Sequence, residues 1–522
     1  MDTTPDPRRW WGLAAIGLAQ LMVVLDMTIV NIALPTAQAD LGISDADRQW
    51  VITAYTLAFG GLLLLGGRLG DVFGRKQTLI VGLVGFAVAS AFGGVSQTFA
   101  MLIIARALQG VFAALLAPAA LSMLNVTFTD PKERARALGV YGAIAGGGAA
   151  LGLILGGTLT QYLDWRWTLM VNVPIAVVAV VGATLFLHNH GTAGVRTRLD
   201  IPGALLATGG VLAIVFALSE AEQHGWASTL VLTMFALGAV LLTVFVLVER
   251  RTPHALLPLH LLRDRNRVGA LAAVGLTQIG MFGVFLFLTY YMQGIQGYSP
   301  LKTGVSFLPM VLGMMTGAVG ISARLLPRVG PRRLMLPGML IAASALTFLT
   351  QIDVDSTYWL HIFPGLLLLG LGMGMTFMPS MATATGGVRG TDAGVVSATL
   401  NTTQQVGGSI GIALLNTVAA TATTSWIADH GGDTPAQLAD ATVHGFSTAM
   451  WISVAAVLLA AATAALLVRS PMPGGAHGAA VHGEDLEPAV AAVGEQISGA
   501  DAAAIPAATG TARADEEGGA RS

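Results

Sequence analysis

Two ionisable side chains stand deep inside apolar stretches of the chain, where a charge is costly. Asp26 interrupts an apolar run over residues 12–34, and Arg106 interrupts another over residues 99–122. A charged group at the centre of a bilayer costs about 2.5–3.5 kcal/mol on insertion scales, so such residues are candidates for function. A carboxyl group at this depth could take up a proton on one side of a membrane and release it on the other. The alternative is a structural aspartate that pairs with a cation or caps a broken helix.

The two side chains are expected at similar depth. If successive spans alternate in direction, Asp26 lies about eight residues from the outer end of its span and Arg106 about seven from its own. At 1.5 Å per residue these depths are ~12 and ~10 Å. A direct or water-bridged pair would let Arg106 tune the carboxyl group, whereas a static ion pair would only join two helices.

The elements that must position this pair are membrane-spanning helices. Of the 522 residues, 54% are hydrophobic and 11% are charged, and the mean hydropathy is +0.70. Soluble domains carry about 25% charged residues, so lipid is the expected solvent. A spanning helix needs about 20 apolar residues. We find fourteen such stretches, at 12–34, 49–67, 78–96, 99–122, 138–162, 168–187, 201–219, 229–248, 268–292, 303–326, 334–350, 359–381, 394–421 and 446–468.

The distribution of basic residues orients these spans. With a cytoplasmic N-terminus, the termini and even-numbered loops hold 23 of the 27 Lys and Arg residues, and the opposite loops hold only Arg48, Arg166 and Lys302. Cytoplasmic loops are rich in Lys and Arg, so this alternation predicts fourteen spans with both termini in the cytoplasm. The start of the chain does not resemble a cleaved signal peptide, because Asp26 interrupts the apolar run. We expect a multi-pass protein of a bacterial plasma membrane.

Short matches between the two ends of the membrane region indicate an internal repeat. Residues 17–20 recur as 275–278, and the pattern of Arg68 and Gly74 recurs as Arg324 and Gly330. Repeated halves in a helical membrane protein are typical of transporters, which bind substrate between the repeats. The predicted division is a 6+2+6 arrangement. It comprises a cytoplasmic N-terminus (1–11), a six-helix bundle (12–190), an inserted two-helix hairpin with its loops (191–267), a second six-helix bundle (268–468) and a disordered cytoplasmic tail (469–522).

The loop between spans two and three combines glycines with charges of both signs. Gly67 and Gly74 permit a tight turn, and Asp71 lies among cations that include Arg75 and Lys76. These charges could pair with the other half of the chain and act as a conformational latch. A solvated basic loop that only sets topology is the alternative, although such a loop needs no aspartate.

Spans five and thirteen are the least apolar, which suggests that they face other helices or water. Span five carries small residues every fourth position, which let helix backbones approach closely and serve either packing or a hinge. Span thirteen carries neutral polar side chains that could contact a ligand or a facing helix. The glycines are Gly148, Gly152, Gly156 and Gly157, and the candidates for a substrate cavity are Asn31, Gln109, Asn401, Gln404 and Gln405.

Several kinds of chemistry find no support in the sequence. The chain has no cysteine, and none of its ten histidines lies deep in a span, so we expect no metal site and no histidine relay. The segment from Gly297 to Lys302 lacks the second glycine of a P-loop, so we expect no ATP site and no cofactor. The net charge of −2 gives no indication of nucleic-acid binding.

Together these motifs resemble the major facilitator superfamily, and specifically its fourteen-span branch of drug–proton antiporters. The resemblance covers nearly all of residues 10–468. It rests on the span-one segment 25–35, the loop 67–76, the span-four segment 106–110, residues 165–174, residues 293–304 and the span-thirteen segment. It implies an all-α membrane fold in which two bundles rock about a central cavity. It also implies that Asp26 is the proton or cation site, that Arg106 is its partner, and that Asp71, Arg75 and Lys76 are gating contacts.

The sequence departs from that branch in two places. Span five usually contains Gly-Pro, but here Gly152 precedes Leu153, which weakens the assignment of a proline-linked bend. Some relatives that export dications carry extra acids in span thirteen, where this chain has amides. We therefore expect neutral, anionic or monovalent organic substrates, and efficient export of dications would count against this.

The leading hypothesis is a proton-driven exporter of hydrophobic small molecules such as antibiotics, acting as a monomer with lipid, protons and substrate as its partners. A proton symporter for uptake of a polar nutrient is the second hypothesis, but it usually needs more intramembrane polar groups than Asp26 and Arg106. A membrane-embedded enzyme or receptor is the third. An enzyme would need several catalytic residues near one depth, and the sequence shows no such cluster.

Overall fold

The computed structural model describes residues 8–45, 47–188, 200–252, 255–257, 259–386, 393–432 and 434–469, with the side chains of residues 71, 131, 132, 135, 145, 222, 223, 393 and 394 left out. The predicted tail therefore lies, apart from its first residue, outside the described part. Every regular element in the described ranges is helical. Fourteen of these segments are long and apolar enough to cross a membrane, which confirms the predicted number of spans.

The first six spans are formed by seven helices, because the sixth span is divided in two after Met170. They are α1 (Arg9–Leu41), α2 (Trp50–Phe73), α3 (Arg75–Gly94), α4 (Phe99–Thr127), α5 (Pro131–Tyr162), α6 (Trp167–Met170) and α7 (Asn172–Phe186). Below, these are called the N-terminal helices. α1 packs on α5 and α7, α2 packs on α4, and α3 packs on α4 and α7.

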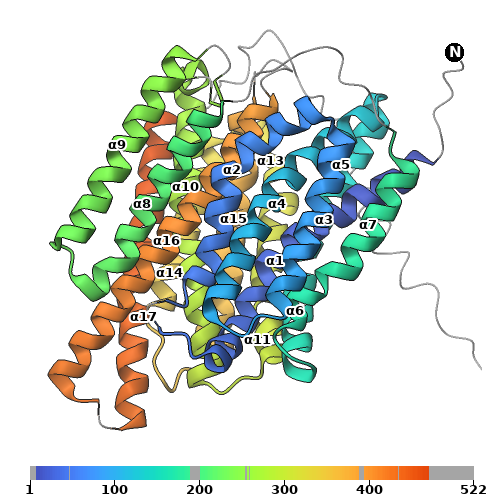
Figure 1. Ribbon diagram of the computed structural model, residues 1–522. Coiled ribbons are helices and arrows are strands. Elements are labelled where there is room, and N and C mark those ends of the chain that lie inside the picture. The colour runs from blue at the N-terminus through green and yellow to red at the C-terminus, as the bar shows by residue number, and fades with distance from the viewer. Residues whose placement is uncertain are drawn as a thin grey trace, which may run out of the picture. The chain divides into compact units, whose positions relative to one another are not determined.

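The next two spans form a hairpin of α8 (Ile201–His224) and α9 (Thr229–Arg251), followed by the short 3-10 helix η1 (Leu259–Arg263). Figure 1 shows this hairpin in green beside α16. α8 packs against α9, against α2 and against α16, so it covers the seam between α2 and α16.

The last six spans, called the C-terminal helices, contain three π-helical segments. They are α10 (Arg265–Tyr290), η2 (Tyr291–Ile295), α11 (Pro300–Ser306), α12 (Leu308–Met315), η3 (Thr316–Ser322), α13 (Ala323–Val329), α14 (Arg332–Leu349), η4 (Tyr358–Ile362), α15 (Phe363–Thr385), α16 (Ala393–His430) and α17 (Pro435–Leu467). The tenth span, Pro300–Val329, runs through α11, α12, η3 and α13.

The repeated loop has the same local conformation in both halves. Gly74 ends α2 with φ 98°, and Gly330 ends α13 with φ 80°. Only glycine adopts such angles readily, because a Cβ atom would meet the neighbouring carbonyl. Each glycine N–H also bonds to the carbonyl four residues earlier, Gly70 or Leu326. The weak sequence repeat therefore corresponds to a shared helix ending.

The buried apolar side chains gather mainly into two clusters. One lies among α1, α2, α3, α4 and α7, and the other lies mostly among the C-terminal helices but includes side chains of N-terminal helices, such as Ile52 and Leu102. α1 contributes to both, because Met22 and Val23 belong to the first cluster whereas Ile29 and Ile32 belong to the second. The helix that carries Asp26 therefore takes part in the packing of both regions.

Candidate functional site

Asp26 and Arg106 form a direct ion pair in the interior of the N-terminal helices. Arg106 Nη1 lies 2.6 Å from Asp26 Oδ2, and the two residues are 1% and 0% exposed. α1 supplies the aspartate and α4 supplies the arginine, both from well within the helix. A single buried charge is very costly, so the pairing is what allows both groups to be ionised here.

Two amide side chains complete the surroundings of the Asp26 carboxylate. Gln109 Nε2 donates to Asp26 Oδ1 at 2.9 Å, and Asn172 Nδ2 donates to the same oxygen at 3.0 Å. Gln109 lies one helical turn after Arg106, and its Oε1 accepts from Arg106 Nη1 at 2.9 Å. Each oxygen of the carboxylate therefore has a donor from the protein itself.

The arginine has contacts beyond the carboxylate. Arg106 Nε donates to the carbonyl of Val51 at 3.0 Å, and the guanidinium lies 4.4 Å from the centroid of the Tyr55 ring. Gln109 Nε2 also lies 2.7 Å from Ser90 Oγ. The network around Asp26 thus connects α1, α2, α3, α4 and α7. A proton gained or lost at Asp26 would change the charge at the centre of a network to which all five helices contribute.

The sequence placed Gln109 among the cavity candidates, whereas the structure buries it fully beside Asp26. Asn172, Tyr55 and Ser90 were not among the predicted site residues. Neutral polar side chains within an apolar span carry no depth or charge signal, although Asn172 lies in one of the segments that carry the family resemblance. The three-residue spacing between Arg106 and Gln109 was the one signal in the sequence that could have placed Gln109 beside the ion pair.

Two other cavity candidates each contact Met27 of α1, Asn31 from the same helix and Gln405 from α16. Asn31 Nδ2 donates to the Met27 carbonyl at 2.8 Å, and Gln405 Nε2 lies 3.8 Å from Met27 Sδ. Both amides are buried, and within the described residues neither Asn31 Oδ1 nor Gln405 Oε1 has a hydrogen-bond partner. A buried amide oxygen without a partner is costly, so these two acceptors are suited to a ligand that donates.

The remaining candidates on α16 are less enclosed. Asn401 is exposed and donates to the Ser397 carbonyl at 3.1 Å, and Gln404 is partly buried. Gln278 of α10, which the sequence marked only as part of the repeat, is buried and has an unpartnered Oε1 within the described part of the chain. It joins Asn31 and Gln405 as a candidate for contact with a ligand.

The motif of residues 67–76 was predicted as a loop, but it is helical apart from Gly74, because α2 continues to Phe73 and α3 begins at Arg75. Its side chains contact two different parts of the chain. Lys76 Nζ donates to the carbonyls of Thr184 and Leu187 at 2.9 and 2.5 Å, so it caps α7 within the N-terminal helices. Arg68 Nη2 donates at 3.2 Å to the carbonyl of Ala255, which lies between α9 and η1. The side chain of Asp71 lies outside the described residues. The roles of Gly67, Asp71, Arg75 and Lys76 in gating stay predictions.

The glycines of α5 permit close packing against two partners. α5 is one continuous helix, and a Cβ atom added at Gly148, Gly152 or Gly156 would meet side-chain or backbone atoms of α1. A Cβ at Gly157 would lie 2.5 Å from Cα of Leu301, in α11. Packing is therefore observed at all four positions, and a hinge role stays a prediction.

A pair of alanine substitutions in α5 should separate packing from helix propensity. Gly152→Ala would place a methyl group 3.1 Å from the Leu25 carbonyl and in overlap with Thr28 Oγ1, whereas nothing lies within 4 Å at Gly146. Overpacking costs about 1–3 kcal/mol, so Gly152→Ala should lower the thermal unfolding temperature in detergent. Gly146→Ala should leave it unchanged or raise it slightly, since alanine favours helix. Equal effects of the two substitutions would contradict close α1–α5 packing.

The N- and C-terminal helices meet at the end where α1 stops and α2 begins. Arg48 Nε donates to Asn416 Oδ1 at 3.2 Å, and its guanidinium lies 4.1 Å from the centroid of the Tyr290 ring. Arg48 Nη1 also pairs with Asp45 at 3.1 Å. The hydroxyl of Tyr290 donates to Gln38. These cross-contacts close this end of the boundary between the two sets of helices, the end that the charge pattern predicts to be extracellular.

The N-terminal half of α5 has fewer neighbours on its glycine face than the C-terminal part of the same helix. A Cβ atom at Gly142, Gly146 or Gly147 would meet nothing within 4 Å, whereas Gly157 lies against α11. α5 therefore contacts the C-terminal helices near its C-terminus and leaves its N-terminal half uncovered on the glycine face. Which side of the membrane this open half of α5 faces stays a prediction.

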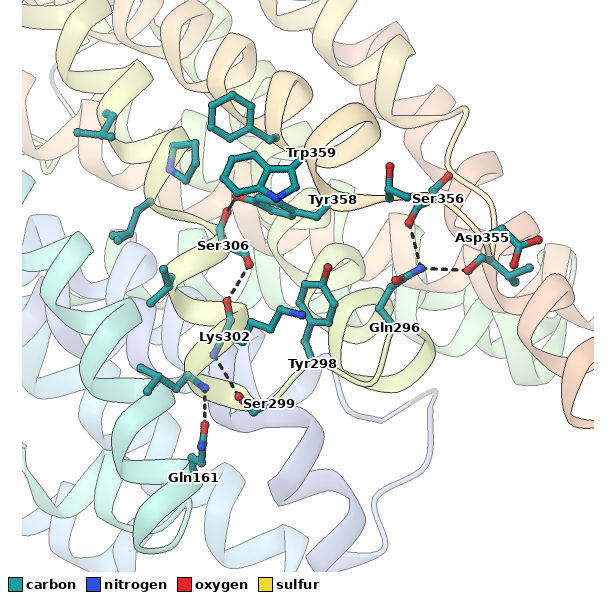
Figure 2. Close-up of a pocket in the computed structure, with 18 residues that line it drawn as sticks. Gln161, Gln296, Tyr298, Ser299, Lys302, Ser306, Asp355, Ser356, Tyr358 and Trp359 are labelled. Carbon is teal, nitrogen blue, oxygen red and sulfur yellow. Dashed lines mark hydrogen bonds between the residues drawn. The ribbon is translucent and has the colours of Figure 1, made fainter.

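A separate cavity of about 1020 Å³ lies next to α11 and η4, and it includes no residue of the Asp26 network. Figure 2 shows Tyr298, Lys302, Tyr358 and Trp359 in its wall. Lys302 Nζ lies 3.4 Å from the centroid of the Tyr298 ring, and Trp359 is 72% exposed. Exposed aromatic side chains of this kind are typical of the membrane interface. Because no residue of the Asp26 network lines this cavity, nothing in its wall links it to proton coupling.

Fourteen apolar helices, built with a repeated loop and a neutralised charge pair in the interior, define a multi-pass membrane transporter. The family model described as Major Facilitator Superfamily matches residues 16–412, and the chain belongs to this family. It is thus a transporter of the cell membrane and not an enzyme.

Two curated relatives cover most of the chain. The puromycin resistance protein pur8 of Streptomyces alboniger is 54% identical over 468 residues, which are 89% of this chain and 92% of the relative. The cephamycin export protein CmcT of Amycolatopsis lactamdurans is 37% identical over 470 residues, or 88% and 93% of the two chains.

Solved structures support the fold. A bacterial homologue of the human lysosomal transporter Spinster has a TM-score of 0.65 at 16% identity, covering 91% of this chain and all of that one. An auto-inhibited peptide transporter of the POT family has a TM-score of 0.66 at 19% identity, covering 90% and 99%. The predicted major facilitator fold is confirmed.

Proposed function

We propose that this protein is a proton-coupled antiporter that exports hydrophobic small molecules by alternating access. The observation that carries the proposal is the Asp26 carboxylate, fully buried and held by Arg106, Gln109 and Asn172. Relatives named for resistance to puromycin and export of cephamycin support efflux as the direction of transport.

The geometry suggests how a proton could exchange for substrate. Protonation of Asp26 removes the negative charge that Arg106 contacts, and therefore weakens the strongest bond between α1 and α4. Asn31 lies on the same helix as Asp26, and Gln405 of α16 contacts that helix at Met27. A movement of α1 that follows protonation of Asp26 would therefore also change the proposed substrate contacts.

Alternating access requires contacts that break on one side as others form. In this account the Arg48 cluster and the α5–α11 contact close the outside, and they separate when the protein opens outward. The loop at Gly67–Lys76 takes the corresponding part on the cytoplasmic side. Both termini are placed in the cytoplasm, and the protein acts as a monomer that draws energy from the proton gradient without a cofactor.

The substrate class follows from the polar groups at the boundary. α16 presents Asn401, Gln404 and Gln405 where dication exporters carry acids, so neutral, anionic or monovalent organic compounds fit best. Puromycin is the first compound to test because of the relative named for it. Self-resistance to an antibiotic made by the same cell is one biological setting for such an exporter.

Transport direction under an imposed gradient separates antiport from the alternative of symport. Proteoliposomes loaded with labelled puromycin are diluted into acidic medium, with protein-free liposomes correcting for passive movement of this weak base. An antiporter releases puromycin faster when the outside is acidic, because inward proton flow drives outward substrate flow. Slower release, or accumulation of external puromycin from the acidic medium, would indicate symport and contradict the proposal.

A further inference from the structure

Two buried carboxyl groups face each other at the base of the inserted hairpin, far from Asp26 in the fold. Asp200 precedes α8 and Glu249 lies in the last turn of α9, and they are 5% and 4% exposed. A Cβ atom added at Gly203 would lie 2.6 Å from Asp200 Oδ2 and 2.9 Å from Glu249 Oε1. The two oxygens therefore share the small space above this glycine.

The other contacts of these carboxyl groups leave one oxygen without a donor. Asp200 Oδ1 accepts from the N–H of Gly203 at 2.9 Å and so caps α8. Glu249 accepts from the N–H groups of Leu256 and Leu257 at 3.2 and 3.1 Å. Within the described residues Asp200 Oδ2 has no partner. A buried, unpartnered oxygen directed at a second carboxyl group indicates that a proton is held between them.

Among the described residues, no charge neutralises the pair. No ion pair to Asp200 or Glu249 occurs there, and the neighbouring Arg250 and Arg251 are exposed. Arg68, on α2, bonds the Ala255 carbonyl instead. Arg196, Arg198 and His254 lie outside the described residues. Two ionised carboxylates in a shared buried site repel, and one bound proton removes the repulsion and supplies the missing hydrogen bond.

The pair is connected to both sets of spanning helices. Glu249 holds the backbone of residues 256–257, and the adjoining Ala255 carbonyl accepts from Arg68 at the end of α2. Further along the hairpin, Thr208 Oγ1 donates to the Gly61 carbonyl of α2 at 3.0 Å. The Leu218 carbonyl accepts from Thr417 of α16 at 2.7 Å. The hairpin and its loop therefore form a strap across the α2–α16 seam.

We infer that Asp200 and Glu249 bind one shared proton, and that this proton keeps residues 255–257 in place for the hydrogen bond from Arg68 of α2 to the Ala255 carbonyl. The inserted hairpin is then a strap whose attachment to α2 depends on protonation. The part of the inference that concerns gating rests on the proposed function. Loss of the proton leaves two facing carboxylates, which separate and release residues 255–257 from α2. The strap would thus respond to pH on the side of the membrane that bears the basic loops.

A distance measurement between spin labels tests this without substrate or gradient. The chain has no cysteine, so labels can be placed at two introduced cysteines, Phe73→Cys at the exposed end of α2 and Leu257→Cys in the loop. Full-length protein is measured in nanodiscs at about pH 6 and about pH 9, on either side of the range expected for a coupled carboxyl pair. The inter-label distances should be narrowly distributed at acid pH and shift to longer, broader values at alkaline pH.

Two isosteric variants and one control decide the outcome. Asp200→Asn can donate across the pair and still caps α8, so it should lose the pH-dependent shift and keep the acid distribution. Glu249→Gln can also donate across the pair, but it leaves one of the two N–H groups of residues 256–257 without an acceptor, so it should lose the shift and give a broader distribution at both pH values. Glu220→Gln, which alters the i,i+4 pair with His224 at the other end of α8, should keep the full shift. A shift that persists in both pair variants, or no shift in the parent protein, would overturn the inference.

The measurement is independent of the coupling site. If the strap titrates as described but puromycin moves inward with protons, only the proposed antiport fails. If antiport is found and the label distances do not respond to pH, only the strap fails. Either carboxyl variant alone is sufficient should the other not yield folded protein.

Discussion

Asp26→Asn is expected to abolish efflux driven by a pH gradient while folded protein remains in the membrane. The new amide has nearly the same shape as the carboxylate, but it carries no charge and does not ionise. Asn172 Oδ1 has no partner within the described residues, so a rotation of that amide can accept from the substituted side chain. Arg106 keeps the Val51 carbonyl, Gln109 and the Tyr55 ring. Arg106 is left as a buried cation without its carboxylate, so the variant should be less stable than the parent protein, but these remaining contacts should let it fold although the proton site is lost.

The measurement for this prediction is the initial rate of puromycin release from proteoliposomes under an imposed gradient. Asp440→Asn is the matched control, since it is the same chemical change at an exposed aspartate of α17, outside the Asp26 network and the Arg48 cluster. The control should keep most of the driven release, whereas Asp26→Asn should fall to the rate of protein-free liposomes. Driven release that is unchanged in Asp26→Asn would remove this residue from the coupling mechanism.

Arg106→Gln is expected to change the pH dependence of efflux and to reduce its amplitude. The arginine donates a charge-assisted hydrogen bond of 2.6 Å to the carboxylate, and such bonds contribute about 1.5–3 kcal/mol. Without this cation the Asp26 carboxylate loses its strongest hydrogen bond, so proton exchange at this site should respond differently to external pH.

The dependence of the release rate on external pH distinguishes two roles of Arg106. In one it adjusts proton exchange at Asp26, and in the other it only holds α1 against α4. Arg166→Gln serves as the control, because Arg166 pairs with Asp40 and Asp164 in a half-exposed position. Its profile should overlay that of the parent protein. A lower amplitude with an unmoved profile in Arg106→Gln would mean that the pair only holds α1 against α4, which is the structural alternative that the sequence left open.

The pairing of Asp26 with Arg106 was predictable because charge in lipid is rare and depth can be counted from span ends. That argument could not reach Asn172, Tyr55 or Ser90, whose roles depend on how α7, α2 and α3 pack around the pair. It also gave Gln109 a place in the cavity, although helical spacing puts it beside Arg106. Neutral polar side chains become informative only once the neighbouring helix is known.

The fold was predictable to the level of spans and a repeat. Hydropathy found the fourteen spans, and the weak match between Gly74 and Gly330 corresponds to two helix ends with the same positive φ. Composition could not show that the tenth span changes between α-helix and π-helix, or that α8 lies across the α2–α16 seam. These features arise from contacts between distant segments, such as Thr208 with Gly61 and Leu218 with Thr417.

Proton release on substrate binding tests the central claim most directly. Purified protein in weakly buffered detergent solution is mixed with puromycin at a concentration that gives measurable thermal stabilisation, and the pH is followed. If substrate and proton exchange at Asp26, the parent protein acidifies the solution and Asp26→Asn, which still binds puromycin, does not. Binding without proton release in the parent protein, or equal release from the variant, would contradict the account.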